Sequence, residues 1–214
     1  MKHLLLFILF LSGLVVWSSC EKNPTTNNPT NALGTMTDGR DAETYATVTI
    51  GGQTWMAENL RHNVTGSWED SNYPSSIYGR LYDWNTAKNI CPSGWHLPSD
   101  EEWKTLEMHL GLSATEADQS AQFRGSFGIQ MKSTTGWSSN GNGTNLSGFN
   151  AFPAGYYRKD SSSYHNLEIY ANFWTATQFS GAYAWLRTLA HNRAGINRSS
   201  TQKEDGYSCR CVQD

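Results

Sequence analysis

The most constraining feature of this sequence is a series of short β-type runs separated by clusters of Gly, Asn, Ser and Asp. Residues 45–50 alternate around β-branched side chains, and Gly51-Gly52 is a two-residue hairpin signal, so residues 53–57 are expected to return beside them. Similar runs cover residues 173–177, 182–187 and 207–212. In the last run, odd and even positions should point to opposite faces of a strand. This pattern predicts a mainly antiparallel sheet.

Two helices have a clear local signature in the first half of the chain. Ser99 to Glu102 forms a capping box, and Trp103, Leu106 and Leu110 then fall on one helical face. A second capping box at residues 113–116 precedes a shorter helix expected through 117–123, and a short turn is expected at 82–87. The fold class is therefore α+β, with short helices in the N-terminal half on a twisted, mainly antiparallel sheet. Capping explains the carboxylates at 100–102 better than acid–base chemistry does.

The composition indicates one globular domain rich in aromatic residues. The 214 residues include nine Trp, ten Tyr and eight Phe, whereas only 16% are charged. That balance excludes a disordered chain, a coiled coil and a collagen-like fibre. The formal net charge of −3 provides no basic surface for phosphates, so no nucleic-acid partner is expected.

The N-terminal segment predicts export. Lys2-His3 precedes an apolar run over residues 4–16, and Ser18-Ser19-Cys20 resembles a bacterial lipobox, with Trp17 where Leu is usual. We therefore expect a signal peptide over 1–19, a lipidated Cys20 that anchors the chain to a membrane, and a tether over 20–33. The folded domain then covers 34–214. Cleavage by the ordinary signal peptidase, without lipidation, is the alternative.

Several separated blocks resemble the Fibrobacter succinogenes major paralogous domain family. The most distinctive is Cys91-Pro-Ser-Gly-Trp-His-Leu-Pro98, followed by Glu102-Trp103. The other blocks, in the family's order, cover residues 34–41, 48–60, 79–84, 148–155, 173–177 and 206–212. The resemblance implies a fold related to C-type lectins and formylglycine-generating enzymes. It also implies an exported, often lipid-anchored protein of the Fibrobacter and Bacteroidetes kind, at the outer membrane or cell surface, with adhesion or carbohydrate contact as suggested roles.

The resemblance also implies a pairing for the remaining cysteines. Similar sequences have Cys at the positions of Cys91 and Cys211 and an apolar residue at that of Cys209, so a Cys91–Cys211 disulfide and a buried Cys209 are expected. The alternative is a copper-binding Cys209–Cys211 pair of the kind that formylglycine-generating enzymes use to activate oxygen. The different spacing makes this alternative the weaker one.

Other catalytic patterns are not found in the sequence. The six histidines lie at 3, 62, 96, 109, 165 and 191, without the spacing that places two metal ligands on one helix face. We expect His96 to hydrogen-bond in the core. The sequence has no nucleophile elbow, no phosphate-binding Gly loop and no calcium motif of C-type lectins at the expected places. The chain is therefore predicted to have no enzymatic activity, no cofactor and no metal.

Aromatic residues in the predicted loops are candidates for ligand contact. Residues 133–148 form an uncharged stretch that contains Trp137, and a second group follows near residues 156–166. Sugars are recognised by flat aromatic faces with nearby amides and hydroxyls. The candidate ligand-binding residues are Trp137, Tyr156, Tyr157, Tyr164 and Asn166, with core packing as the alternative for each. The expected partner is a glycan or a cell-envelope protein. A structural or assembly subunit of a surface complex is the second hypothesis.

Overall fold

The computed structural model describes residues 31–214. The predicted signal peptide, Cys20 and most of the tether lie outside these residues. The first described residues already belong to the domain, because the Asn31 side-chain amide donates to the Ser147 carbonyl at 2.7 Å and the first strand begins at Leu33. Residues 31–33, which the sequence placed in the tether, thus contact the folded part of the described chain. Among residues 31–214, no helix is both long enough and apolar enough to span a membrane.

The first sheet is antiparallel throughout and contains the predicted hairpin. In this hairpin, Ile50 pairs with Gln53 across the glycine turn. The sheet has the order β1-β2-β3-β14-β6. Its strands are β1 (Leu33–Thr37), β2 (Thr44–Ile50), β3 (Gln53–Met56), β14 (Val212–Gln213) and β6 (Trp95–His96).

The second sheet has seven strands and is antiparallel except where β10 pairs with β13. Its strands, in spatial order, are β4 (Ser67–Trp68), β5 (Leu81–Tyr82), β13 (Tyr207–Ser208), β10 (Tyr170–Gln178), β11 (Tyr183–Ala190), β12 (Ile196–Gln202) and β7 (Phe123–Arg124). A separate hairpin joins β8 (Tyr156–Arg158) to β9 (Ser163–His165). The predicted runs at 173–177 and 182–187 thus lie in the central strands.

The helices are short, as expected. They are α1 (Ser75–Tyr78), α2 (Trp84–Ala87), α3 (Asp100–His109), α4 (Ala114–Asp118) and α5 (Gly128–Met131). Both predicted capping boxes are present. However, α4 ends at Asp118 rather than near Phe123, because Gln119 is extended and Phe123 enters β7 to pair with β12. Few short helices and mostly antiparallel sheets make the domain α+β.

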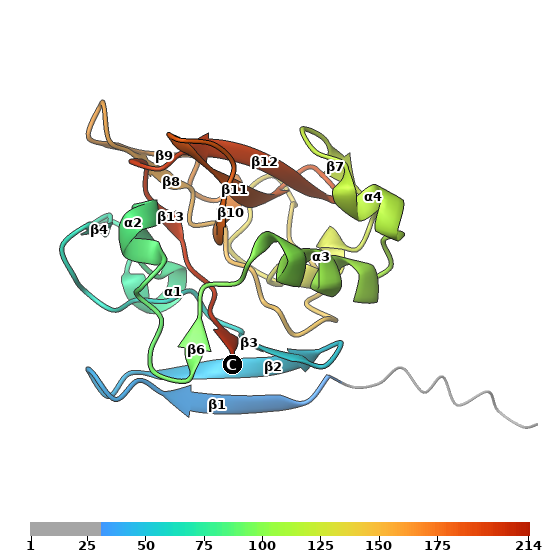
Figure 1. The fold of residues 1–214 in the computed structure, drawn as a ribbon, viewed down its shortest axis with the longest axis horizontal. Helices are drawn as coiled ribbons and strands as arrows, with labels where there is room; N and C mark the ends of the chain where they lie inside the picture. The colour runs from blue at the N-terminus through green and yellow to red at the C-terminus, as the bar shows by residue number, and fades with distance from the viewer. Residues whose placement is uncertain (1–30) are drawn as a thin grey trace, which may run out of the picture. The chain divides into compact units, whose positions relative to one another are not determined.

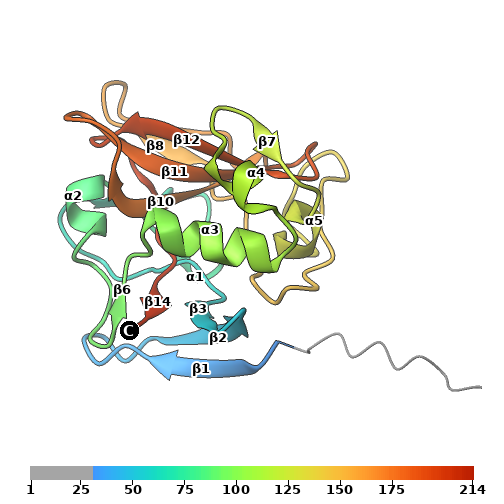
Figure 2. The same cartoon turned by 45° about the vertical axis from the view of Figure 1, so that its right-hand side comes forward.

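Helix α3 lies between the two sheets (Figures 1 and 2). Its Trp103 is fully buried, with ring centroids 5.0 Å from Trp55 and 5.7 Å from Phe173. This contact joins β3 of the first sheet to β10 of the second through the helix. Of the tryptophans expected in the core, four are buried (Trp55, Trp84, Trp103 and Trp174), whereas Trp95 and Trp185 are partly exposed.

The alternation predicted for residues 207–212 is wrong, because this segment is not one strand. It leaves the seven-stranded sheet as β13 (Figure 1) and joins the five-stranded sheet as β14 (Figure 2). All six residues are buried. Between the two strands, the carbonyl of Cys209 accepts from Leu60 N at 3.0 Å and that of Cys211 from Met56 N at 2.9 Å. A segment covered on both sides has no solvent face, so a two-residue alternation does not apply to it.

The uncharged stretch 133–148 contains no helix or strand, as predicted. Its backbone is nevertheless fixed by hydrogen bonds, since Gly143 N donates to the Ser133 carbonyl at 2.8 Å and Ser147 N donates to the Gln130 carbonyl at 3.0 Å. The Asn142 side chain accepts from Trp137 N at 3.0 Å. This loop therefore has a defined conformation and packs against the core.

Candidate ligand-binding cleft

Trp137 does not face solvent. Only 5% of it is exposed, and its indole N–H donates to Ser133 Oγ at 3.0 Å and to the Ala151 carbonyl at 3.2 Å. The ring packs in the same hydrophobic cluster as Trp103. The expectation that Trp137 offers a stacking face is corrected here, because both its ring and its polar edge are used inside the domain.

The β8–β9 hairpin brings the three candidate tyrosines together. Tyr157 pairs with Tyr164 and Tyr156 pairs with His165 across the two strands. Tyr157 is 7% exposed, whereas Tyr164 is 37% exposed and its hydroxyl donates to the Glu69 carbonyl at 2.6 Å. Asn166 follows β9 with a positive φ of 57°, and its carbonyl accepts from Tyr170 N. Asn166 therefore shapes the turn after the hairpin, and Tyr164 is the most exposed of the three tyrosines.

Trp68 is the aromatic residue that the sequence analysis missed. It lies in β4, is partly exposed, and stacks on Tyr157 with ring centroids 4.5 Å apart and planes at 15°. Gly206 lies against the same pair, since a Cβ there would be 2.8 Å from the Trp68 ring. Trp68 lies outside the family blocks, but so do Trp137 and Trp185, so nothing in the sequence distinguished Trp68 from them.

A cleft of about 660 Å³ opens beside Trp68. Its walls come from β4, the start of α2, Lys159 in the β8–β9 turn and the turn after β12. Its lining consists of Thr65, Gly66, Trp68, Asp83, Asn85, Thr86, Lys159, Lys203 and Glu204. The volume lies within the range of roughly 300–1,000 Å³ that is typical of small-molecule sites.

Some polar side chains of this cleft already form hydrogen bonds within the protein, whereas others do not. Asp83 caps α2, accepting from Thr86 N at 2.8 Å and from Thr86 Oγ1 at 3.2 Å. The side chains of Asn85, Lys159 and Glu204 are largely free, with no side-chain hydrogen bond among residues 31–214. The Lys159 ammonium lies 5.5 Å from the centroid of Trp68. The cleft thus offers an indole beside an amide, an ammonium and a carboxylate.

Trp68 also lines a second hollow, on the side of Tyr73, Tyr78 and Tyr164. This hollow has about 20 Å³ of open volume, which is room for roughly one water molecule. It is too small to hold a sugar ring. The larger cleft is therefore the candidate site.

The cysteines form the predicted disulfide. Cys91 and Cys211 are bonded with Cα atoms 5.9 Å apart, and Cys209 is a free, fully buried thiol. Burial raises the pKa of the Cys209 thiol well above its ordinary value. These residues do not fit a copper site, because the sulfur of Cys211 is bonded to Cys91 and the thiol of Cys209 is shielded and protonated.

His96 forms hydrogen bonds, but at the surface rather than in the core. Its Nε2 lies 2.7 Å from Glu102 Oε1 and its Nδ1 lies 2.6 Å from Asp214 Oδ1, with 41% of the side chain exposed. Partial burial on its own would lower the pKa of His96, but the hydrogen bonds to Asp214 and Glu102 outweigh it and raise the pKa. His96 thus links β6, the start of α3 and the C-terminal residue.

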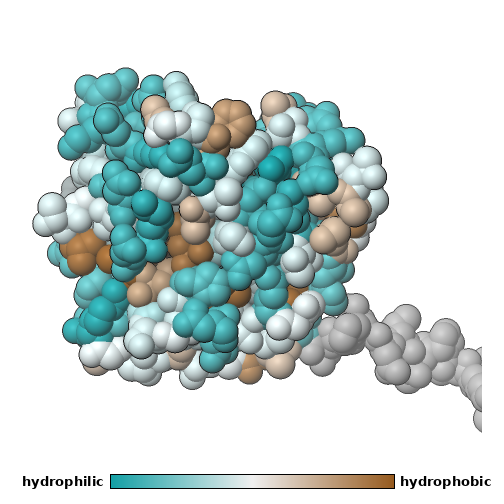
Figure 3. Space-filling view, viewed as in Figure 1, coloured by the Kyte–Doolittle hydropathy of each residue, from teal (hydrophilic) through white to brown (hydrophobic). Residues whose placement is uncertain are grey.

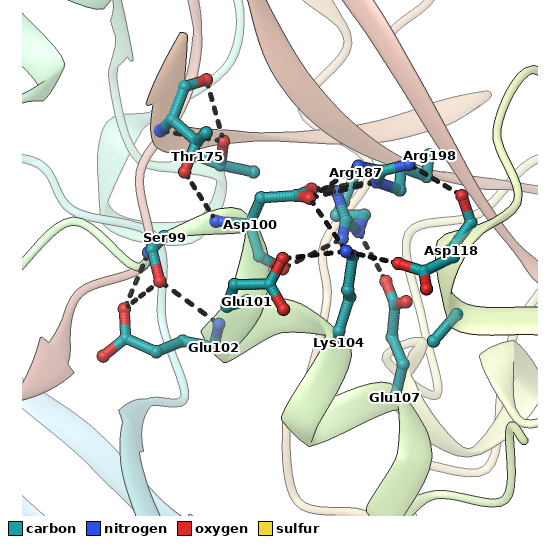
Figure 4. Close-up of polar contacts among 12 residues, drawn as sticks. Ser99, Asp100, Glu101, Glu102, Lys104, Glu107, Asp118, Thr175, Arg187 and Arg198 are labelled. Atoms are coloured by element: carbon teal, nitrogen blue, oxygen red, sulfur yellow. Dashed lines mark hydrogen bonds and ion pairs between the residues drawn. The ribbon is translucent and has the colours of Figure 1, made fainter. Parts of the chain in front are cut away.

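A buried charge cluster joins α3 to the seven-stranded sheet (Figure 4). Asp100 accepts from Arg187 and from Arg198 at 2.7 Å each, and Glu107 pairs with Arg187 and Arg124. Burial would raise the pKa of Asp100, but the two arginines outweigh this effect and lower it. Asp100 is thus an ion-pair residue as well as a first-turn residue of α3. None of these charged residues lines the cleft or the small hollow beside Trp68. We therefore assign the cluster a structural role.

Three further groups lie close enough together to share a cation. Oxygen and nitrogen atoms of Asp38, Asp41 and His62 lie within 4.8 Å of one another. However, both oxygens of the buried Asp38 carboxylate already accept from the Arg40 guanidinium. Arg40 thus neutralises the Asp38 carboxylate, so we assign Asp38 and Asp41 to the turn after β1, where His62 from the segment after β3 pairs with Asp41.

Comparison with known proteins identifies the family. The model of the Fibrobacter succinogenes major domain matches residues 48–213. The chain therefore belongs to this family. No curated protein and no solved structure gave a significant match.

Proposed function

We propose that this protein is an exported, lipid-anchored binding or adhesion module that holds a glycan in the cleft beside Trp68 and does not transform it. One observation carries the proposal: a partly exposed indole, supported from behind by Tyr157, borders a cleft whose free side chains are an amide, an ammonium and a carboxylate. Sugars present C–H faces that stack on such rings and hydroxyls that bond to such groups.

Two further considerations support this proposal. On the face in Figure 3 the hydrophobic residues form small, separate areas in a mainly hydrophilic surface, which suits a polar ligand better than a broad apolar partner. The α+β architecture with its long-range disulfide is compatible with a C-type-lectin-like scaffold, which we include in the proposal. Anchoring through Cys20 would place the domain at the outer membrane or cell surface.

A glycan array tests the proposal. The full chain, purified from membranes in detergent, is compared with the Trp68→Ala variant. We expect binding to at least one glycan class and loss of that binding in the variant, which should remain folded but melt at a lower temperature because Trp68 also stacks on Tyr157. Trp95→Ala is the matched control, since Trp95 is also a partly exposed tryptophan in a two-residue strand but lies in the other sheet. Its binding should be retained.

The opposite result points to the second class of function. If the chain binds no glycan on the array and envelope proteins co-purify with it, glycan binding is rejected. The result would then support a role as a structural or assembly subunit.

A further inference from the structure

We infer that the ligand of the Trp68 cleft is a neutral, linear oligosaccharide that runs from Trp68 past α2 to the turn between β10 and β11. This inference rests on the proposed function and specifies its ligand. It depends on a second cleft, on the fixed residues between the two clefts, and on the balance of charges along both.

The second cleft has part of its lining in common with the first. It has a volume of about 370 Å³ and is lined by Asn85, Gly181, Ala182, Gln202, Lys203 and Glu204. Three of these residues, Asn85, Lys203 and Glu204, also line the cleft beside Trp68. The two clefts therefore share a wall, and the inferred ligand runs along this wall from one cleft to the other. We call the two clefts together the groove.

The size of each half favours a ligand longer than one sugar ring. Both volumes lie within the roughly 300–1,000 Å³ that hold small molecules. A single ring on Trp68 would leave the half beside Gly181 filled with water. A linear chain would use both halves, and the groups on their shared wall could bond to hydroxyls of successive rings.

The shared wall is held in place by Lys203. Its ammonium donates to Gln178 Oε1 at 2.7 Å and to the Gly181 carbonyl at 2.8 Å, and it lies 4.3 Å from the Trp84 ring centroid. Its backbone carbonyl accepts from Trp84 N at 2.9 Å, and its backbone N–H donates to the Ala182 carbonyl at 3.0 Å. These contacts tie α2 to the β10–β11 turn, so the groove is formed before a ligand arrives.

The charges along the groove favour a neutral chain. Two cations, Lys159 and Lys203, face two anions, Asp83 and Glu204. The lining therefore has no net charge that would attract an acidic polysaccharide. Binding should accordingly depend little on ionic strength.

A blocking substitution separates the two halves of the groove. A Cβ at Gly181 would meet no atom within 4 Å, so Gly181→Tyr adds a bulky side chain to the lining of the second half without a clash at Cβ. Gly39 is equally open but lies in the turn after β1, which makes Gly39→Tyr the matched control. Neither glycine has a positive φ.

The measurement is isothermal titration of the full chain with neutral xylo-, cello-, manno- and chito-oligosaccharides from disaccharide to hexasaccharide. In at least one series we expect affinity to rise about tenfold or more from the disaccharide to the longer chains, which corresponds to ~1.4 kcal/mol. Gly181→Tyr should remove this gain and keep disaccharide binding, whereas Gly39→Tyr should keep both. Uronic-acid oligosaccharides should bind no more tightly than their neutral counterparts.

Each other outcome overturns a defined statement. Trp68-dependent binding that is equally strong for all chain lengths, or unaffected by Gly181→Tyr, rejects the extended ligand and leaves glycan binding in place. Preference for uronic-acid chains rejects the neutral ligand. Absence of binding to every glycan rejects both this inference and the proposed function.

Discussion

Removing the Cys91–Cys211 disulfide should cost the domain much of its stability. The bond closes a loop with a sequence separation of 120. In the chain-entropy relation, a loop of this length restricts the unfolded chain by about 16 cal/mol/K, or ~5 kcal/mol at 25 °C. Typical domains have only about 5–15 kcal/mol of stability in total. The double variant Cys91→Ala/Cys211→Ala should therefore unfold at a much lower denaturant concentration.

The control for this experiment is the third cysteine. Cys209→Ala removes a buried sulfur from the same segment without breaking a crosslink, since Cys209 is free and fully buried. Guanidinium unfolding of both variants, followed by tryptophan fluorescence, compares the crosslink with the packing of one sulfur. A double variant that unfolds at the same midpoint as Cys209→Ala would refute the reasoning.

Three further predictions concern single residues. Asp100→Asn should destabilise the domain by about 3–5 kcal/mol in denaturant unfolding, because it leaves the buried Arg198 without a carboxylate and Arg187 with Glu107 alone. The exposed Glu101→Gln should change stability by less than ~1 kcal/mol. Because folding raises the pKa of His96, protonated His96 stabilises the folded domain. This stabilisation is complete below the pKa that His96 has in the unfolded chain, and it is lost as the pH rises through the pKa in the folded domain. Thermal unfolding across neutral pH should show that loss, and His96→Gln should remove it. Gly155→Ala should lower the melting temperature, because φ is +65° and the new Cβ would lie 2.2 Å from the His165 carbonyl oxygen; an unchanged melting temperature would contradict this.

Local chemistry explains what could be predicted from the sequence. The capping box at Ser99 and the Gly51-Gly52 turn involve neighbours in the chain, and both form as expected. The Cys91–Cys211 pairing followed from family resemblance and was not derivable from spacing. The burial of Trp55 and Trp103 agrees with their places in family blocks.

Long-range packing explains what could not be predicted. Asp100 contacts Arg187 and Arg198, which lie 87 and 98 residues away, so a local pattern shows only the capping role of its neighbours. Trp68 becomes part of a cleft because β4 pairs with β5 and the β8–β9 hairpin places Tyr157 behind it. The groove itself joins residues near 68, 85, 159 and 203, which share no motif.

The segment 207–213 has a consequence for the order of folding. Because it supplies one inner strand to each sheet and carries Cys211, neither sheet is continuous until this segment has been synthesised. Arg210 in the same segment donates to the carbonyls of Met56 and Phe149, so these contacts to earlier parts of the chain also cannot form before the segment is made. A nascent chain that lacks these residues would expose the interior of both layers, and productive folding must therefore follow, rather than accompany, synthesis of the domain.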